Sequence, residues 1–285
     1  MNKEQLSNLR GKAEQGDAEA QFNLGMLYVH GEGVRRDDTI ARQWFEKSAD
    51  QGNADAQFHL GVMYHVNARD QQDYATARQW YEKAAAQGNS DALNGIGGMY
   101  QYGLGVPQDH EQARQWYEKA AAQGNVSANL YIGCLYAHEH GVGQDYTKAR
   151  EWYEKAAAQG NVGAAVFLGE LYRLGQGVPQ DFVQAGQWFQ RAANQGDEKA
   201  QVNIGELYAK GQGVPQDDVR AYMWWSLALA QDGYQQHEAT TNRDEVARHM
   251  TPTQLAEAKR LVQEYQARKS RVAKVRSWDG ETGTL

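Results

Sequence analysis

The same thirteen residues, ARQWYEKAAAQGN, occur at positions 77–89 and again at positions 113–125. The two copies lie 36 residues apart, and the same interval recurs along most of the chain. It separates six Gln-Gly pairs, whose glycines are Gly16, Gly52, Gly88, Gly124, Gly160 and Gly196. A fixed interval of this size is the sequence signature of a repeat array.

Each repeat predicts a pair of helices, which in the first copy lie near residues 18–30 and 38–51. Asp17 and Asp37 suit helix N-caps, because a short acidic side chain accepts hydrogen bonds from N–H groups of the first turn. Gly31 ends the first helix, since glycine adopts positive φ readily. Apolar residues then follow one face of each helix, which predicts that neighbouring pairs stack to bury them.

One glycine recurs inside the first helix of every repeat, at Gly25, Gly61, Gly97, Gly133, Gly169 and Gly205. A glycine in a helix interior costs about 1 kcal/mol relative to alanine. We therefore predict a close contact between the two helices of a pair, with an aromatic or alanine of the second helix as the partner.

The repeated pattern is Gly-Asp/Asn-x-x-Ala-x-x-x-Leu-Gly-x-x-Tyr, then Gly-x-Gly-Val-x-x-Asp, then Ala-x-x-Trp-Tyr-x-x-Ala-Ala-x-Gln-Gly. It resembles the Sel-1-like repeat family, a branch of the tetratricopeptide-like (TPR-like) solenoids that is abundant in bacteria. The resemblance implies an all-α fold, a right-handed α-solenoid (α/α superhelix) of six 36-residue helix-turn-helix repeats plus a C-terminal helical cap. Residues 67–70 and 139–142 depart from the Gly-x-Gly-Val loop, so we expect different loops there.

These boundaries divide the chain into four expected parts. Residues 1–16 start the array, residues 233–269 form capping helices and residues 270–285 form a flexible basic tail. The six repeats between them span residues 17–52, 53–88, 89–124, 125–160, 161–196 and 197–232.

The cap is expected to contain a helix at about 236–249 and a second helix from Pro252. Thr251 and Gln254 have the spacing of a capping box, and proline suits the first helical position. One face of this last helix carries Leu255, Ala258, Val262 and Tyr265. A cap of this kind closes the open core at the end of a solenoid. The cations of the tail suit a solvated helix end, and the alternative is an anionic partner or a membrane surface.

Composition narrows the class of protein. The 285 residues carry a net charge of −7, which argues against a general nucleic-acid binder. No apolar run approaches the length of a membrane span, so no membrane insertion is expected. The first residues of the chain lack an apolar stretch. We therefore expect a cytoplasmic protein, or a periplasmic one if a leader has been removed.

The residues offer little for catalysis. Cys134 and His138 stand at i and i+4, with His140 close by, a spacing that a metal site can use. No third ligand is assured, and no base is positioned to activate the thiol. We expect no enzyme, no metal and no cofactor, and a small-molecule ligand is not favoured.

The positions that change between repeats indicate a binding surface. On the first helix these are the positions of residues 19, 22, 26, 29 and 30. Resemblance to tetratricopeptide proteins places this stripe on the concave surface, where ligands commonly lie. The candidate partner-binding residues are Glu19, Phe22, Met26, His30, Asp55, Phe58, Val62, His65, Asp91, Asn94, Gly98, Tyr102, Leu130, His138, Glu170, Arg173, Lys199, Glu206 and Lys210.

We hypothesise that this groove binds a protein segment with a basic stretch and an exposed apolar side chain. Phe22, Phe58 and Tyr102 would anchor it, although the two phenylalanines also suit a core between repeats. Gly95 and Gly98 suggest a notch in mid-groove. The last repeats look basic at Arg173, Lys199 and Lys210.

The leading functional prediction is a non-catalytic interaction scaffold or adaptor. A narrower form is an immunity or inhibitor protein that neutralises a bacterial toxin or effector by tight binding. From other classes, a cell-envelope or carbohydrate binder and a hydrolase near Cys134 and His138 stay open as alternatives.

Overall fold

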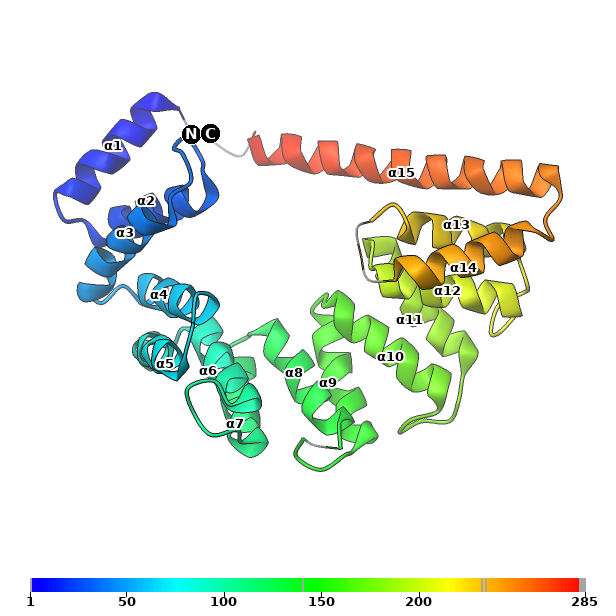
Figure 1. The fold of residues 1–285 in the computed structure, drawn as a ribbon, viewed down its shortest axis with the longest axis horizontal. Helices are drawn as coiled ribbons and strands as arrows, with labels where there is room; N and C mark the ends of the chain where they lie inside the picture. The colour runs from blue at the N-terminus through cyan, green and yellow to red at the C-terminus, as the bar shows by residue number, and fades with distance from the viewer. Residues whose placement is uncertain (1, 140, 232, 234, 282–285) are drawn as a thin grey trace. The chain divides into compact units, whose positions relative to one another are not determined.

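The computed structural model describes residues 2–139, 141–231, 233 and 235–281. These residues form fifteen α-helices and no strand (Figure 1). The chain divides into two compact units, Met1–Gln144 and Asp145–Leu285. The first unit contains α1 (Lys3–Glu14), α2 (Ala18–His30), α3 (Asp38–Asp50), α4 (Ala54–Val66), α5 (Gln71–Ala86), α6 (Ser90–Tyr102), α7 (His110–Ala122) and α8 (Val126–Ala137). The second contains α9 (Tyr146–Ala158), α10 (Val162–Leu174), α11 (Phe182–Gln195), α12 (Glu198–Lys210), α13 (Asp218–Ala228), α14 (Gln236–Ala247) and α15 (Pro252–Glu281).

The helices of the first repeat begin and end almost where the sequence predicts. Asp17 caps α2 by accepting a hydrogen bond from the Ala20 N–H at 2.8 Å. Asp37 caps α3 by accepting from the N–H groups of Thr39 and Ile40. Gly31 follows α2 with a φ of 72°, a left-handed conformation that suits glycine.

The helix-interior glycines lie where two helices of a pair meet. A Cβ atom added to Gly61 would come within 2.5 Å of the Tyr81 ring, closer than non-bonded atoms approach. The same holds for Gly25 on Phe45, Gly97 on Tyr117, Gly169 on Phe189 and Gly205 on Trp225. The predicted contact with an aromatic of the second helix is therefore confirmed at these five positions.

The deepest aromatic of each repeat is the residue after the repeated tryptophan. Phe45, Tyr117 and Phe189 are almost fully buried, whereas Trp44 and Trp116 are only partly buried. Trp44, Trp80, Trp116 and Trp152 each lie under the ammonium group of the lysine three residues later. Trp80 also packs on the cluster around Phe45 and Leu60, so it belongs to the contact between repeats.

A buried glutamine joins neighbouring repeats in both units. Gln57 donates its amide to the Ala49 carbonyl at 3.2 Å and accepts a hydrogen bond from Gln87 at 2.8 Å. The same arrangement is found for Gln21 and Gln201. Each amide bridges the end of the preceding helix pair and the second helix of its own pair, because a buried polar group needs partners.

The loop of repeat two differs for a steric reason. In repeat three the second loop glycine, Gly105, packs on the first turn of α5, and a Cβ there would lie 2.8 Å from Tyr74. Gly177 and Gly213 pack on the preceding second helix in the same way. Arg69 occupies the equivalent position in repeat two, and its side chain does not fit that contact. There α5 begins early, capped by Asp70, so the expected difference in the loop is confirmed.

The end of the chain folds onto α11 and α13. Thr251 and Gln254 form the predicted capping box at the start of α15, with hydrogen bonds of 2.8 and 3.2 Å. Tyr265 donates to the Ala193 carbonyl at 3.0 Å, and its ring meets Trp224 edge-on at 5.4 Å. Val262 and Leu261 pack on the same core.

The last helix is longer than the sequence analysis predicts. It runs to Glu281, whereas the prediction places a flexible tail from residue 270. Residues 270–281 contain no proline and a single glycine, Gly280, so little in the sequence stops the helix. The helix therefore continues into the segment expected to be a tail, whose flexibility stays a prediction, and residues 282–285 lie outside the described part of the chain.

Candidate partner-binding surface

Three carboxylates form a row on the first unit. Glu19, Asp55 and Asp91 lie in the first turns of α2, α4 and α6, and all three are exposed. Asn89 donates to Asp55 at 3.0 Å, and Asn125 donates to Asp91 at 2.7 Å. Each of these asparagines is the N-cap of the next first helix. The stacking of repeats thus holds two of the three acids in place.

The two phenylalanines of the predicted stripe pack between repeats. The Phe22 ring lies 5.8 Å from Phe45 and 5.5 Å from His59, and the Phe58 ring lies 5.8 Å from Tyr81. Both side chains are partly buried, as are those of Met26, Val62 and Leu130. These contacts support the alternative interpretation of the pair as core, with only part of each side chain accessible.

Tyr102 is the exposed aromatic of the stripe. Its side chain is 64% exposed at the end of α6. Gly98, one turn earlier, has only the Tyr117 hydroxyl near a hypothetical Cβ, at 3.7 Å. At Gly95 a Cβ would lie 3.2 Å from Tyr81, so the α6 backbone fills that side of the expected notch. Asn94 has a buried side-chain oxygen without a hydrogen-bond partner among the described residues.

His59 is a residue of this region that the sequence analysis does not select. Its ring stacks on Phe45 at 5.3 Å and is half-buried, and this burial lowers the pKa of the imidazole. Burial also lowers the pKa of His65, which meets Tyr74 edge-on at 5.6 Å. His30 and His138 are exposed. The signal available in the sequence was a ring at the same repeat position in three of the repeats, at His59, Tyr131 and Phe167, which are 72 and 36 residues apart.

The candidate residues of the second unit are paired with each other. Arg173 donates two hydrogen bonds to Glu170, at 2.6 and 2.8 Å. Lys199 lies 3.6 Å from the same carboxylate, and Lys210 pairs with Glu206. Each cation therefore faces an acid, and the expectation of a basic surface at Arg173, Lys199 and Lys210 is corrected to one of nearly balanced charge.

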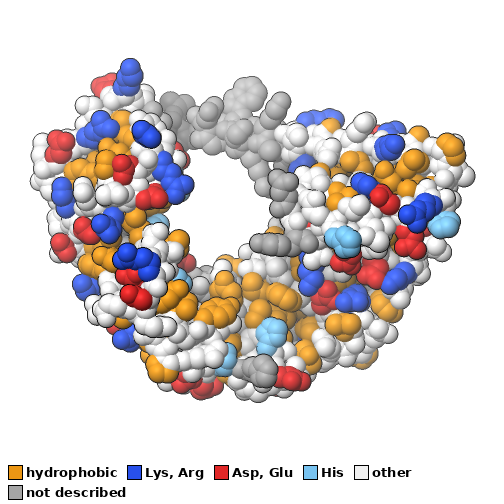
Figure 2. Space-filling view, in the orientation of Figure 1, with side chains coloured by type: hydrophobic (Ala, Val, Ile, Leu, Met, Phe, Trp, Pro, Cys, Tyr) orange, Lys and Arg blue, Asp and Glu red, His pale blue; other side chains and the backbone are white. Residues whose placement is uncertain are grey.

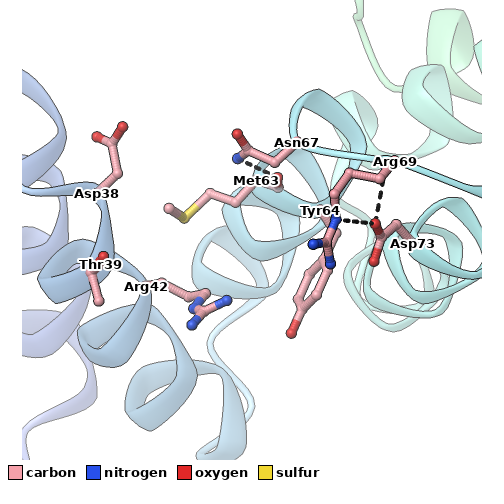
Figure 3. A pocket seen from close by; sticks show the side chains of 8 residues that line it. All are labelled: Asp38, Thr39, Arg42, Met63, Tyr64, Asn67, Arg69 and Asp73. Carbon is pink, nitrogen blue, oxygen red and sulfur yellow. Dashed lines mark hydrogen bonds and ion pairs between the residues drawn. The ribbon is translucent and has the colours of Figure 1, made fainter.

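A pocket of about 480 Å³ lies in the first unit where α3, α4 and the start of α5 meet. Figure 3 shows Arg42 and Met63 extending into this space from α3 and α4. Arg36 holds both oxygens of Asp38 at 3.2 Å, and the Arg69 N–H donates to Asp73 at 3.0 Å. The pocket exists where the loop of repeat two does not cover the first turn of α3. Its charges balance, so it favours no ion of either sign.

The structure gives no support for metal chemistry in the part of the chain that it describes. No group of three histidine, cysteine or acidic side chains lies close enough to hold an ion among these residues. His140, one of the candidate ligands near Cys134, lies outside the described residues.

Figure 2 shows acidic, basic and hydrophobic side chains intermixed on the visible face of the first unit.

Paired helices with a recurring glycine contact and a variable stripe on the first helix define a TPR-like solenoid, a fold typical of protein–protein interaction and generally non-catalytic. The Sel1 repeat matches residues 18–53, 54–89, 90–125, 126–161, 162–197 and 198–233. The chain belongs to the Sel1 repeat family.

Solved structures agree with this assignment. A protective antigen of uropathogenic Escherichia coli with an SLR fold is 36% identical, with a TM-score of 0.80 over 97% of this chain. The chain spans 59% of that antigen's length. A Sel1 repeat protein from Oxalobacter formigenes is 34% identical, with a TM-score of 0.70, over 75% of this chain and 88% of that one. Yeast Tom70, 16% identical with a TM-score of 0.51 over 93% of this chain and 58% of its own, shares the fold.

Two further findings are negative. The chain matches no curated protein significantly. Among the described helices, none combines the length and the apolar composition needed to cross a membrane.

Proposed function

We propose that the first unit binds a segment of another protein along the stripe formed by α2, α4 and α6. Basic residues of that segment would face Glu19, Asp55 and Asp91, and an apolar side chain would pack against Tyr102. The observation that carries the proposal is the row of three exposed carboxylates at equivalent positions of three successive repeats.

The two kinds of contact have different tasks. Complementary charge steers association and fixes the register of the bound segment, whereas a desolvated aromatic anchor supplies most of the affinity. The hydrogen bonds from Asn89 and Asn125 hold Asp55 and Asp91 before any partner arrives. Pre-organisation of this kind reduces the entropy lost on binding.

An affinity pull-down from the source organism, read by mass spectrometry, tests the proposal. The full chain is compared with a variant carrying Glu19→Lys, Asp55→Lys and Tyr102→Ala. A control carries Glu14→Lys, Asp50→Lys and Val183→Ala, which make the same two charge reversals and truncate an exposed apolar side chain at positions outside the stripe. We expect at least one protein to be lost with the stripe variant and retained with the control.

Equal recovery from both variants would contradict a site on this stripe. The same experiment separates two narrower roles. An inhibitor of one toxin or effector would recover a single protein that survives washing at high salt, whereas an adaptor would release its partners as the charges are screened.

A further inference from the structure

The second unit contains a pocket of about 450 Å³ where α14 meets α12 and the start of α13. We call it the cap pocket. Its principal lining residues are Glu206, Lys210, Asp218, Trp225, Glu245 and Val246. Its volume lies within the range of sites that accept small ligands or single side chains.

The cap pocket differs from a contact between two ordinary repeats because one wall comes from the cap. α14 starts 38 residues after α12, close to the position that a seventh first helix would take. Glu245 and Val246 of α14 therefore stand where the array would otherwise continue. The face of α14 that carries these two residues forms one side of the cap pocket.

The floor of the cap pocket is apolar and fixed. Trp225 is almost fully buried, and its indole N–H donates to the Val202 carbonyl at 3.2 Å. A Cβ at Gly205 would lie 2.7 Å from the same indole nitrogen, so the ring is held between α12 and its own helix. Val246 and Ala209 complete this floor.

The rim of the cap pocket carries three carboxylates, one lysine and the imidazole of His249. Glu206 is neutralised by its ion pair with Lys210. Asp218 and Glu245 have no hydrogen bond or ion pair from their side chains in the described part of the chain. Asp218 lies in the first turn of α13, and its side chain is partly buried. Two uncompensated carboxylates thus stand over an apolar floor.

We propose that the cap pocket receives a long basic side chain, arginine or lysine, of a bound protein segment. The alkyl part of that side chain would lie on Trp225 and Val246, and its charged end would meet Asp218 and Glu245. Long basic side chains bury their stems while their charges stay with polar groups, which is the combination this pocket offers. The inference rests on the proposed function, since it adds a recognition feature for a protein partner on the second unit.

A small probe tests the cap pocket without knowledge of the partner. Full-length protein is titrated with N-acetyl-arginine amide and, separately, with the neutral analogue N-acetyl-citrulline amide. The tryptophan indole N–H signals are followed by NMR, and Trp225→Phe identifies the signal of Trp225. We expect a saturable shift of the Trp225 signal with the arginine probe and at least tenfold weaker binding of the citrulline probe.

Matched variants assign the effect to the two carboxylates. Asp218→Asn with Glu245→Gln should weaken arginine binding at least tenfold, because the charge is lost and the shape is kept. Glu238→Gln with Asp244→Asn removes two charges from exposed positions of α14 and should change binding less than twofold. Thermal unfolding of both variants verifies that they fold.

Equal shifts with both probes, or unchanged arginine binding by the pocket variant, would overturn the inference. The wild-type comparison of the two probes gives this answer even if a variant fails to fold. The result is also separate from the stripe on the first unit. If the wild-type protein does not bind the arginine probe selectively but the stripe variant still loses a partner in the pull-down, the cap pocket alone is rejected. The reverse pair of results rejects the stripe alone.

Discussion

Gly61 and Gly98 show that packing requires a glycine at one helical position and not at another. Both are helical glycines of the first unit, on α4 and α6. A methyl group at Gly61 would collide with the Tyr81 ring, whereas at Gly98 its nearest neighbour would be a hydroxyl at an ordinary contact distance. The intrinsic cost of glycine is therefore offset by packing at Gly61 and not at Gly98.

Gly61→Ala should lower the free energy of unfolding by about 1–3 kcal/mol, the usual cost of overpacking a core. Gly98→Ala should leave it unchanged or raise it by up to about 1 kcal/mol, because alanine favours the helix. Urea unfolding measures both. Equal destabilisation by the two substitutions would contradict the packing argument, since backbone conformation alone would then explain the glycines.

At the scale of the elements, rings carry the contact between neighbouring helix pairs. His59 of α4 stacks on Phe45 of α3, and Tyr131 of α8 stacks on Tyr117 of α7. In the second unit Phe167 of α10 stacks on Tyr153 of α9, with ring centres 5.1 Å apart. His59 is the member of this series with an ionisable ring, whose unperturbed pKa is about 6.5.

The stack at His59 predicts a loss of stability in mild acid. Burial lowers the pKa of His59 in the folded chain, so between that pKa and about 6.5 the unfolded chain binds the extra proton. The contribution of His59 is therefore complete above about pH 6.5 and falls as the pH decreases towards the folded pKa. His59→Phe places there the residue found at Phe167, and it should reduce this loss.

Urea unfolding of wild type and His59→Phe at about pH 7.5 and pH 5.5 measures the difference. His237→Gln, at an exposed position of α14, should leave the acid loss unchanged. Some acid sensitivity should persist in every variant because burial also lowers the pKa of His65. An identical loss in wild type and His59→Phe would exclude the stacked imidazole as its source.

The fold follows from the sequence because the same signals recur six times. The caps at Asp17 and Asp37 and the stop at Gly31 place α2 and α3 to within a residue of their observed bounds. Periodicity does not distinguish Trp44 from Phe45, since both lie on the apolar face. The distance to Gly25 decides that Phe45 is the deeper one.

The candidate site is less predictable than the fold, because only part of it recurs with the repeat. The acidic row is visible in the sequence because Glu19, Asp55 and Asp91 are 36 residues apart. The pairing of Lys199 with Glu170 is not, because it depends on how far two side chains reach between helices of different repeats. The cap pocket is equally hidden, since α14 follows no repeat pattern.

At the scale of the whole molecule, each repeat of an array is stabilised by its contacts with the neighbouring repeats. The stability of such arrays is approximately the sum of repeat terms and interface terms. Tyr265 is one interface term of the second unit, because its hydroxyl bonds the end of α11 and its ring packs on Trp224. Its removal should affect nearby helices first.

Tyr265→Ala should speed amide hydrogen exchange in α11 to α15 by at least tenfold and leave α2 to α5 within about threefold of wild type. The expected loss is about 2–3 kcal/mol, below that of a fully buried aromatic because the side chain is only partly buried. Tyr102→Ala, at an exposed position, should change neither region. A uniform increase along the chain would show that both units unfold as one.

The loop contact of Gly105 has a consequence for how such a chain changes its length. Gly105, Gly177 and Gly213 each press on the backbone at the start of the second helix of the preceding repeat, where an aromatic residue stands each time. A copied stretch of 36 codons that keeps this glycine and the aromatic residue would therefore encode a unit that can repeat the same contact with its new neighbour. The array would then lengthen by one whole repeat at a time. The variable stripe of each new copy would be free to diverge towards another ligand.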